Sequence, residues 1–302
     1  MLREMNIDAR VAFAKNRFDD LFVEEAKFWQ FNECLAAVHG DSVFRFYAPG
    51  HPFTGLGHIP WYFEGGQALV SGGVDLQVIP FSTADSNKSV CTFAYTLDDG
   101  GSVRGQADAR HIGQKARSLR MTLLDEDSTD YLGLMQDEIK EVLPNAEIDS
   151  VRWEHESDKD QPFRLYWQCR FPSAGTSGDR ILLKPFDYMS EMSNPFFSSE
   201  RKYALLFDYA FGLQEAAQFT LPEGLSIESL PRDSTYSNGI GSLSVSFTDL
   251  GGSLVVNRLF TLKRPFWPST SYREVQDLYQ TWDNIGDMIV VLSASAKGTT
   301  GP

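Results

Sequence analysis

The chain has 302 residues, a length typical of about two domains. Its hydrophobic content of 42% is sufficient for folded cores. Its net charge of −14 excludes a general nucleic-acid binder, because phosphate binding requires clustered lysine and arginine. No run of about 18 apolar residues occurs, so the sequence predicts no transmembrane segment, and no signal peptide is visible.

The first sixty residues predict the end of a helix, a strand and a hairpin. MLREMN (1–6) is typical of the last turns of a helix, and since nothing precedes it we expect the chain to open inside a domain. Apolar residues alternate over 7–13, which predicts a half-buried strand. FNECLAAV (31–38) and VFRFY (43–47) flank a turn and predict a β-hairpin. The Gly- and Pro-rich stretch 48–61 predicts an irregular loop.

The next segment is predicted to be mostly β with one helix. SVCTFAYTL (89–97) and SVRGQADA (102–109) surround an Asp-Asp-Gly-Gly turn and form the strongest hairpin signal in the chain. Apolar residues at helical spacing predict a helix over 129–142. Two further strands are expected over 148–156 and 163–171.

The last third is predicted to be a β-sandwich with one helix. NPFFSSERK (194–202) has the composition of a linker, and short strands punctuated by turns follow it. Ser271 and Glu274 have the spacing of a capping box, which predicts a helix that ends at Gly286. MIVVL (288–292) predicts a final buried strand.

Three of these segments resemble the second half of a transglutaminase-like domain: LREMNIDARVAFA, FNECLAAV and FYAPGHPFTGLGHIPW. The similar proteins are bacterial, exported, and carry this papain-like core between β-rich domains of unknown function. The segments LDDGGSVRGQ and LPEGLSIESLP, and the end of the chain, are similar to the C-terminal β domains of the same proteins. The resemblance implies a periplasmic or exported location.

Pattern and resemblance together predict a mainly β (α+β) fold of three parts. Residues 1–66 are expected to be a partial transglutaminase-like core. Residues 67–193 and 194–302 are expected to be two β-sandwich-type domains, each with an accessory helix.

The resemblance also implies that the catalytic triad is degenerate. The family uses a Cys thiolate at a helix N-terminus, a His that deprotonates it and an Asp that orients the His. The Cys position lies upstream of Met1, the His position is Glu33, and the Asp position is Tyr47. A carboxylate is too weak a base to deprotonate a thiol at neutral pH. We therefore expect a pseudoenzyme with no catalytic residue.

The cysteines carry no other signal of chemistry. Cys34 follows Glu33 within a predicted strand, and a neighbouring carboxylate disfavours a thiolate. Cys91 and Cys169 lie in predicted strands and are expected to be either paired with each other or simply buried.

The histidines likewise predict neither a metal site nor a cofactor site. His39, His51 and His58 surround the irregular loop, but their spacing matches no common zinc pattern. No glycine-rich segment joins a strand to a helix in the manner of a nucleotide-binding loop. We expect neither a metal nor a cofactor.

The function expected from the sequence is therefore non-catalytic binding or scaffolding, with a protein or a cell-envelope polymer as partner. Two alternatives stay open. In one, the chain is a fragment from a truncated gene of an active transglutaminase-like cysteine hydrolase or acyltransferase, with His39 as a substitute base. In the other, which depends on aromatic residues in a sandwich, it is a carbohydrate-binding module.

Overall fold

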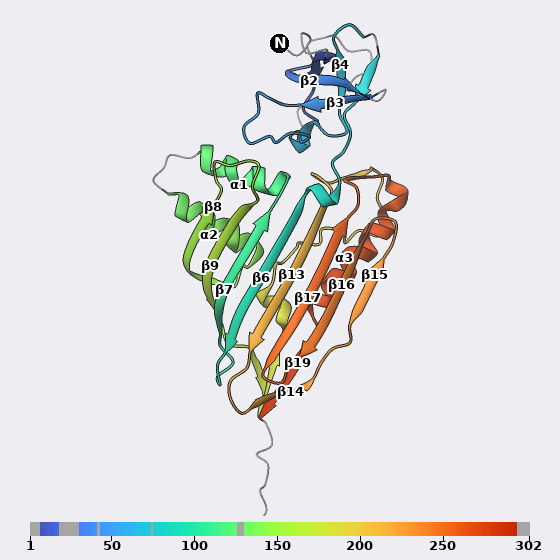
Figure 1. Cartoon of the computed structure of the whole chain (residues 1–302). Coiled ribbons are helices and arrows are strands. Elements are labelled where there is room, and N and C mark those ends of the chain that lie inside the picture. Colours follow the sequence, from blue (N-terminus) through green and yellow to red (C-terminus); the bar gives the residue numbers. More distant parts are fainter. Residues whose placement is uncertain (1–6, 18–29, 41–42, 74, 126–129, 295–302) are drawn as a thin grey trace, which may run out of the picture.

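The computed structural model describes residues 7–17, 30–40, 43–73, 75–125 and 130–294. Its strands form a small sheet near the amino terminus and a large sheet that carries a second layer on one face (Figure 1). The predicted mainly β fold is confirmed. Within the described ranges, no helix has both the length and the apolar character that crossing a bilayer requires. The helix expected over 1–6 lies outside the described residues.

The small sheet has five antiparallel strands in the order β3-β2-β1-β4-β5. They are β1 (Ala9–Ala14), β2 (Glu33–Gly40), β3 (Val43–Tyr47), β4 (Gln67–Val70) and β5 (Leu76–Val78). The predicted first strand and hairpin are confirmed. The sheet continues past the expected domain boundary at residue 66, because Ala68 and Val70 of β4 are buried in the same core as Ala12 and Ala14 of β1.

The large sheet has eight strands in the order β15-β16-β17-β13-β6-β7-β9-β8. In chain order they are β6 (Lys88–Leu97), β7 (Val103–His111), β8 (Glu147–Glu154), β9 (Phe163–Phe171), β13 (Phe211–Thr220), β15 (Ser234–Ser237), β16 (Gly241–Asp249) and β17 (Ser253–Leu262). Each half is antiparallel, and the halves meet where β6 and β13 pair in parallel, from Lys88 opposite Gly212 to Thr96 opposite Thr220.

This parallel pair changes the expected domain organisation. The segments 67–193 and 194–302 do not form separate sandwiches; each contributes four strands to one sheet and buries its apolar side chains in one shared core. Phe93 on β6 and Ala217 on β13 are register partners and both are buried. Periodicity reveals which face of each strand is buried, but it does not reveal which strand lies beside it.

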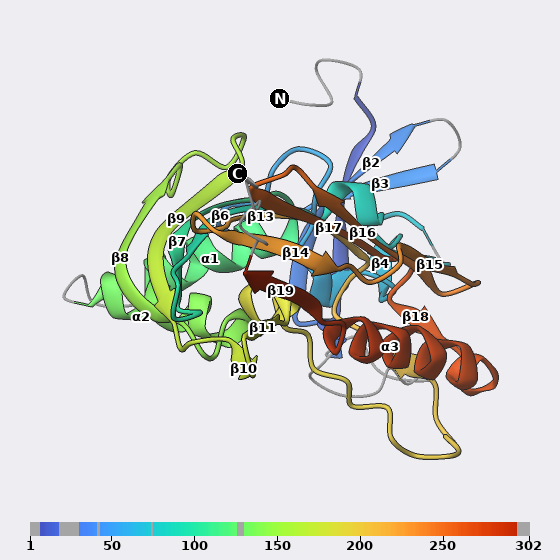
Figure 2. The same cartoon turned by 90° about the horizontal axis from the view of Figure 1, so that it is seen from below.

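A second layer covers one face of the large sheet. Figure 2 shows the large sheet curving around this layer. It contains a four-stranded sheet in the order β10-β11-β19-β14 and three helices. The elements are β10 (Gly175–Ser177), β11 (Arg180–Leu183), β14 (Leu225–Ser229), β19 (Val290–Ala294), α1 (Gln114–Asp125), α2 (Tyr131–Val142) and α3 (Tyr272–Gly286). A short pair, β12 (Leu205–Leu206) with β18 (Phe266–Trp267), and 3₁₀ turns at Trp61–Phe63, Ala84–Ser86, Pro185–Tyr188 and Ser269–Ser271 complete the fold.

The helices agree with the sequence in two cases out of three. Helix α2 lies within the predicted segment, and α3 begins and ends where predicted. The predicted capping box on α3 is wrong: Ser271 makes no capping bond, and the Glu274 carboxylate instead accepts a hydrogen bond from the Gly239 amide at 3.2 Å. Helix α1 was not expected, because its sequence QKARSLRMTLLD is dominated by polar residues.

A buried ion pair lies between the large sheet and the second layer. Arg258 on β17 and Glu215 on β13 are each 1% exposed, and Arg258 Nε donates to Glu215 Oε2 at 2.7 Å. Arg258 Nη2 donates to the Ser190 carbonyl at 2.6 Å, and the Ser190 amide donates to Glu215 Oε1 at 2.9 Å. The guanidinium lies 3.9 Å from the ring of Trp282 on α3. The pair thus connects β13 and β17, which are neighbours in one half of the sheet, to Ser190 and Trp282 in the layer beneath them.

Buried polar side chains join the small sheet unit to the large one. Gln114, at the start of α1, donates to the Ile59 carbonyl at 2.7 Å and accepts from the Trp61 amide at 3.2 Å. Arg17 donates to the Glu64 carbonyl at 3.0 Å and to the Phe207 carbonyl at 3.1 Å. Separating the two units would leave these polar groups without their partners, which destabilises the folded state. The joint therefore holds the two units in a defined arrangement.

Candidate binding groove

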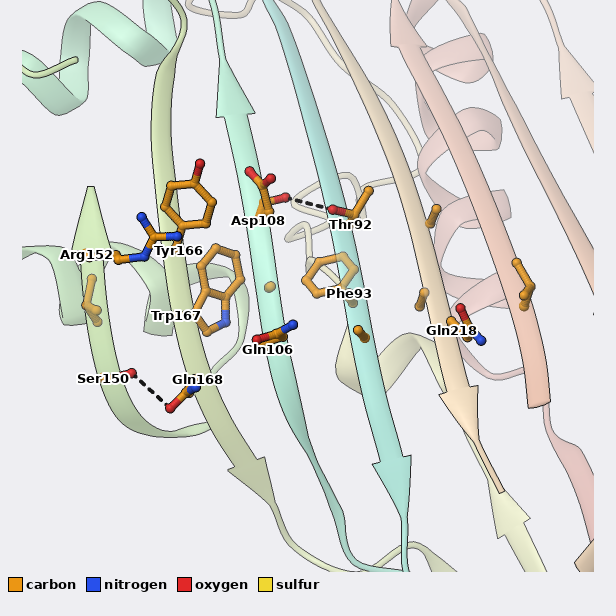
Figure 3. A pocket seen from close by; sticks show the side chains of 16 residues that line it. Thr92, Phe93, Gln106, Asp108, Ser150, Arg152, Tyr166, Trp167, Gln168 and Gln218 are labelled. Carbon is orange, nitrogen blue, oxygen red and sulfur yellow. Dashed lines mark hydrogen bonds between the residues drawn. The ribbon is translucent and has the colours of Figure 1, made fainter. Parts of the chain in front are cut away.

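The candidate site is a groove on the outer face of the large sheet, opposite the second layer. Strands with one buried face expose every second residue, and this face holds a groove of about 730 Å³ (Figure 3). Its floor is low at Ala94 on β6 and Ala216 on β13, where short side chains stand between longer ones. The groove therefore results from small residues on two neighbouring strands, β6 and β13.

The strand registers arrange the groove residues in two rows that cross the strands. One row runs through Arg152, Tyr166, Asp108, Thr92 and Ala216. The neighbouring row runs through Ser150, Gln168, Gln106, Ala94, Gln218 and Val255. The second row crosses six strands, a distance of about 24 Å at the usual spacing between strands. An elongated ligand can therefore lie across the sheet and meet one side chain from each strand.

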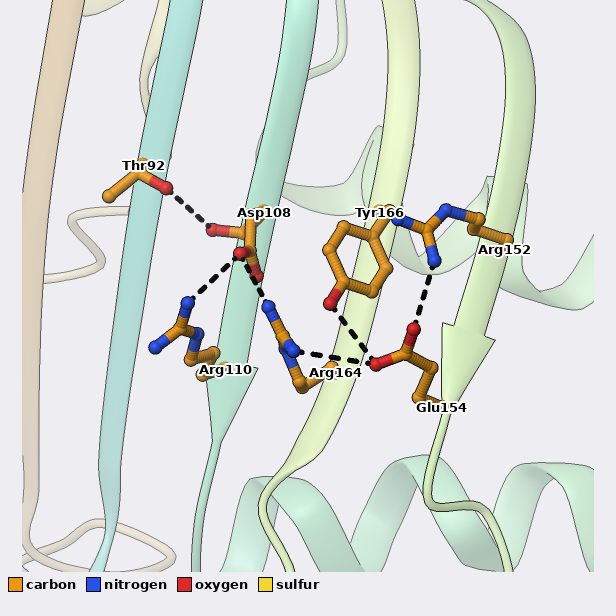
Figure 4. A network of polar contacts seen from close by, with 7 residues as sticks. All are labelled: Thr92, Asp108, Arg110, Arg152, Glu154, Arg164 and Tyr166. Carbon is orange, nitrogen blue, oxygen red and sulfur yellow. Dashed lines mark hydrogen bonds and ion pairs between the residues drawn. The ribbon is translucent and has the colours of Figure 1, made fainter.

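Charged groups are linked in a network at one end of the first row (Figure 4). The Asp108 carboxylate accepts hydrogen bonds from Arg164 at 2.9 Å and from Arg110 at 3.2 Å. Arg152 donates to Glu154 at 3.0 Å, and Arg164 donates to the same carboxylate at 3.5 Å. The opposed charges hold these long side chains in place beside the groove.

The network also sets the pKa of the Glu154 carboxyl group, and it leaves one buried oxygen of Asp108 without a hydrogen-bond donor in the described part of the chain. Desolvation raises the pKa of Glu154, but hydrogen bonds from Tyr166 and Arg152 and the nearby Arg164 charge outweigh it, so that the pKa is lowered overall. The Oδ1 atom of Asp108 is buried and has no hydrogen-bond donor among the described residues.

The aromatic ring beside the groove is already occupied. The Arg152 guanidinium lies 3.6 Å from the centroid of the Tyr166 ring, and the Arg164 guanidinium lies 4.7 Å from it. The Tyr166 hydroxyl donates to Glu154 at 3.1 Å. Because sugars bind aromatic side chains through an open ring face, these guanidiniums compete with a sugar for the Tyr166 ring.

The degenerate triad positions lie elsewhere, in the small sheet. Glu33 begins β2, and Tyr47 ends β3 and pairs with Ala36. The Glu33 carboxylate lies 3.4 Å from Nε2 of His51, while Nδ1 of His51 is hydrogen-bonded to the Tyr62 hydroxyl at 3.1 Å. The structure thus brings Glu33 to an imidazole that the sequence did not connect with it.

All three cysteines are free, so the option of a Cys91–Cys169 disulfide is wrong and the option of burial is confirmed. Desolvation raises the pKa of Cys169 to about 11 and raises that of Cys91 further. Cys34 is exposed on β2. None of the hydrogen bonds in the described part of the chain joins a cysteine sulfur to an imidazole.

The three loop histidines do not meet. His39 packs against Phe44 with ring centroids 5.0 Å apart, His51 contacts Glu33 and Tyr62, and His58 lines the junction between the two units. Over the described ranges, no group of three or more His, Cys, Asp and Glu side chains is placed to hold a metal ion.

The groove was not predicted from the sequence, although strand alternation indicates which residues face outward. The alternation that places Phe93 and Trp167 in the core also places Thr92, Ala94 and Tyr166 on the opposite face. The missing information was the order of the strands, since four of the six strands that line the groove come from one half of the chain and two from the other.

Comparisons with known proteins extend over part of this architecture. Residues 179–292 match the family DUF3858, a domain of unknown function with a solved structure. The matched region contains β13 to β17, α3 and most of β19, so it forms half of the large sheet and much of the second layer. It begins ahead of the expected boundary at residue 194, because β11 pairs with β19.

One solved structure is similar to nearly the whole chain. It is the crystal structure of a "putative protease" from Parabacteroides distasonis, with 10% sequence identity and a TM-score of 0.46 over 97% of the present chain. The present chain spans 41% of that protein's length. No curated protein matches the sequence of this chain. Through residues 179–292, the chain contains a domain similar to the DUF3858 family.

Proposed function

We propose that this protein is a non-catalytic binding protein and that the groove on the outer face of its large sheet holds an extended polypeptide segment. The observation that carries the proposal is the pair of side-chain rows that cross the strands above a floor of alanine. A distance of about 24 Å accommodates roughly seven residues of extended chain.

The chemistry of the second row favours a polypeptide. Gln106, Gln168 and Gln218 are exposed carboxamides, and each can both donate and accept hydrogen bonds. An extended polypeptide presents N–H and C=O groups in alternation, which such side chains can satisfy.

The carboxamide row also favours a second candidate, an oligosaccharide, because sugar hydroxyls donate and accept in the same way. The polypeptide is preferred since guanidinium groups at 3.6 Å and 4.7 Å from the centroid of the Tyr166 ring compete with a sugar for stacking on it. A carbohydrate-binding module therefore remains the alternative to be tested.

The absence of catalysis is part of the proposal. Two of the three thiols are buried with raised pKa values, which opposes formation of a thiolate. We also infer that the small sheet descends from a transglutaminase-like core, in which Glu33 and Tyr47 occupy the former His and Asp positions. Thiol-dependent amidase or cross-linking activity in the purified chain would contradict this part of the proposal.

The binding proposal is tested by selecting displayed random dodecapeptides against the wild-type chain. Peptides that bind the wild type should lose binding to Ala94→Arg and Ala216→Arg, which fill the groove floor. The matched controls are Thr96→Arg and Thr220→Arg, which add the same side chain at exposed positions one row away. The controls should retain binding.

Three outcomes count against a polypeptide ligand. Selection could yield no peptide, or peptides that bind the filled variants as well as the wild type. On a glycan array, saturable binding that Ala216→Arg abolishes would assign the groove to a sugar instead.

A further inference from the structure

A second cavity lies at the joint between the two units, away from the outer face. Its volume is about 390 Å³, and its walls come from the loop 53–59 of the small unit, the start of α1, and the connection 159–162 between β8 and β9. Cavities between structural units are common places for small ligands.

A buried arginine forms one wall of this cavity. Arg120 is 2% exposed. Its Nε donates to the His155 carbonyl at 3.0 Å, and its Nη2 donates to the carbonyls of Asp158 at 2.8 Å and Gln161 at 2.7 Å. No carboxylate among the described residues lies within ion-pair distance of Arg120. Backbone carbonyls therefore orient this guanidinium, and the charges of Asp158 and Asp160 act on it from beyond ion-pair distance.

A second arginine lies one turn earlier on α1. Nη2 of Arg117 reaches the Tyr62 hydroxyl at 3.4 Å, and its Nε is buried without an acceptor among the described residues. Arg117 likewise has no carboxylate within ion-pair distance in the described part of the chain. The third cation, Lys159, is paired with Asp160 at 2.9 Å.

Positive side chains near the amino-terminal end of a helix are electrostatically unfavourable. The first turn of α1 contains no acidic residue, and the helix dipole places partial positive charge at the same end. Arg117 lies in the first turn of α1 and Arg120 one turn later, so that with Lys159 three cations and one carboxylate, Asp160, line the cavity within the described ranges.

The cavity walls also contain unusual backbone. Phe53 lines the cavity with φ of 55°, and His155, whose carbonyl holds Arg120, has φ of 67°. Non-glycine residues rarely adopt these values, and they persist where the surrounding structure imposes them. The loop at His155 is thus held in a conformation that presents its carbonyl to Arg120, and Phe53 forms part of another wall.

We propose that this cavity binds an oxyanion, a phosphate or a carboxylate group of a small ligand, between Arg117 and Arg120. The backbone carbonyls leave Nη1 of Arg120 as its free donor group, and among the described residues neither guanidinium has a carboxylate within ion-pair distance, so each can donate a charge-assisted hydrogen bond to an oxygen of such a group. The remaining volume, beside His58, Thr54 and Leu56, accepts the uncharged part of the ligand.

Calorimetric titration of the full chain with two probes tests the proposal. The probes are inorganic phosphate and N-acetylglycine, in chloride buffer of constant ionic strength, with N-acetylglycinamide as the uncharged control. Saturable binding of either oxyanion, without binding of the amide, supports the site, and the tighter probe identifies the source of the oxyanion. Failure of both oxyanions to bind above the amide overturns the proposal.

Substitutions locate the binding. Arg117→Gln should weaken the oxyanion by roughly tenfold, since a hydrogen bond to a charged group is lost. Arg104→Gln removes the same charge at an exposed position on β7 and should leave affinity within about twofold. Arg120→Lys, which keeps the charge but loses Nη1 and the hydrogen bonds that orient it, should also weaken binding, and its melting temperature reports whether it folds. Unchanged affinity in Arg117→Gln overturns the proposal.

Discussion

Replacing Arg258 with methionine tests whether the two halves of the large sheet form one cooperative unit. The change leaves the Glu215 carboxylate on β13 without its partner. Both residues are 1% exposed, so water cannot replace the lost guanidinium. Breaking a buried pair from one side costs about 3–5 kcal/mol. The Ser190 carbonyl loses its donor, and the Trp282 ring loses a cation at 3.9 Å. We therefore expect a loss of unfolding free energy at the upper end of this range.

Urea unfolding followed by fluorescence measures this loss and its cooperativity. With a slope of about 3 kcal/mol per molar, the transition should move by roughly 1–2 M. Single-tryptophan variants that retain Trp167 report on the first half of the sheet, and those that retain Trp282 report on the second. Both signals should shift together, since Arg258 on β17 is bonded to Ser190, which belongs to the chain segment that supplies the other half of the sheet, and both halves share one core.

A double substitution is the control. Arg258→Met with Glu215→Leu removes both charges, and buried pairs replaced by apolar residues of similar volume recover much of the stability. We expect the double variant to regain more than half of the loss. If Trp167 and Trp282 report separate transitions, or if Arg258→Met costs less than about 1 kcal/mol, the shared core is wrong.

Two further predictions follow from buried titratable groups. Because burial raises the pKa of Cys169 to about 11 and that of Cys91 further, a thiol reagent at pH 8 should modify Cys34 promptly and the other two only on unfolding; rapid modification of more than one described cysteine contradicts their burial. Burial lowers the pKa of His111 to about 3, so the unfolded chain binds a proton below about pH 6.5 that the folded chain does not. Its neutral state therefore contributes stability that is lost as the pH falls from about 6.5 toward 3, by up to about 1.4 kcal/mol per pH unit. In His111→Gln the difference in unfolding free energy between pH 6 and pH 4 should be smaller than in the wild type by about 2 kcal/mol; equal pH dependence in the two proteins contradicts it.

Local patterns in the sequence predicted local structure well. The first hairpin, the strands around the Asp98–Gly101 turn and the position of α3 follow from alternation, turn residues and helical spacing. Helix α1 was missed because its burial depends on a few residues, such as Ala116 and Leu119, among charged neighbours. Tertiary packing, not propensity, makes that segment a helix.

Long-range pairing limited the rest of the prediction. Glu215 and Arg258 look like ordinary exposed charges in the sequence, yet β13 and β17 place them together at the core. Glu33 meets His51 only because the loop after β3 turns back toward β2. The groove and the junction cavity are likewise assembled from segments distant in the chain, and no single segment carries a signal for either.

The parallel seam between β6 and β13 has a consequence for how the chain can be made and divided. The paired residues are about 120 positions apart in the sequence. During synthesis, more than a third of the protein is therefore made between β6 and its second neighbour, β13. An unpaired strand edge is open to pairing with other chains. Cutting the gene near residue 193 would make that temporary exposure permanent in both products, and each piece would be expected to aggregate when expressed without the other.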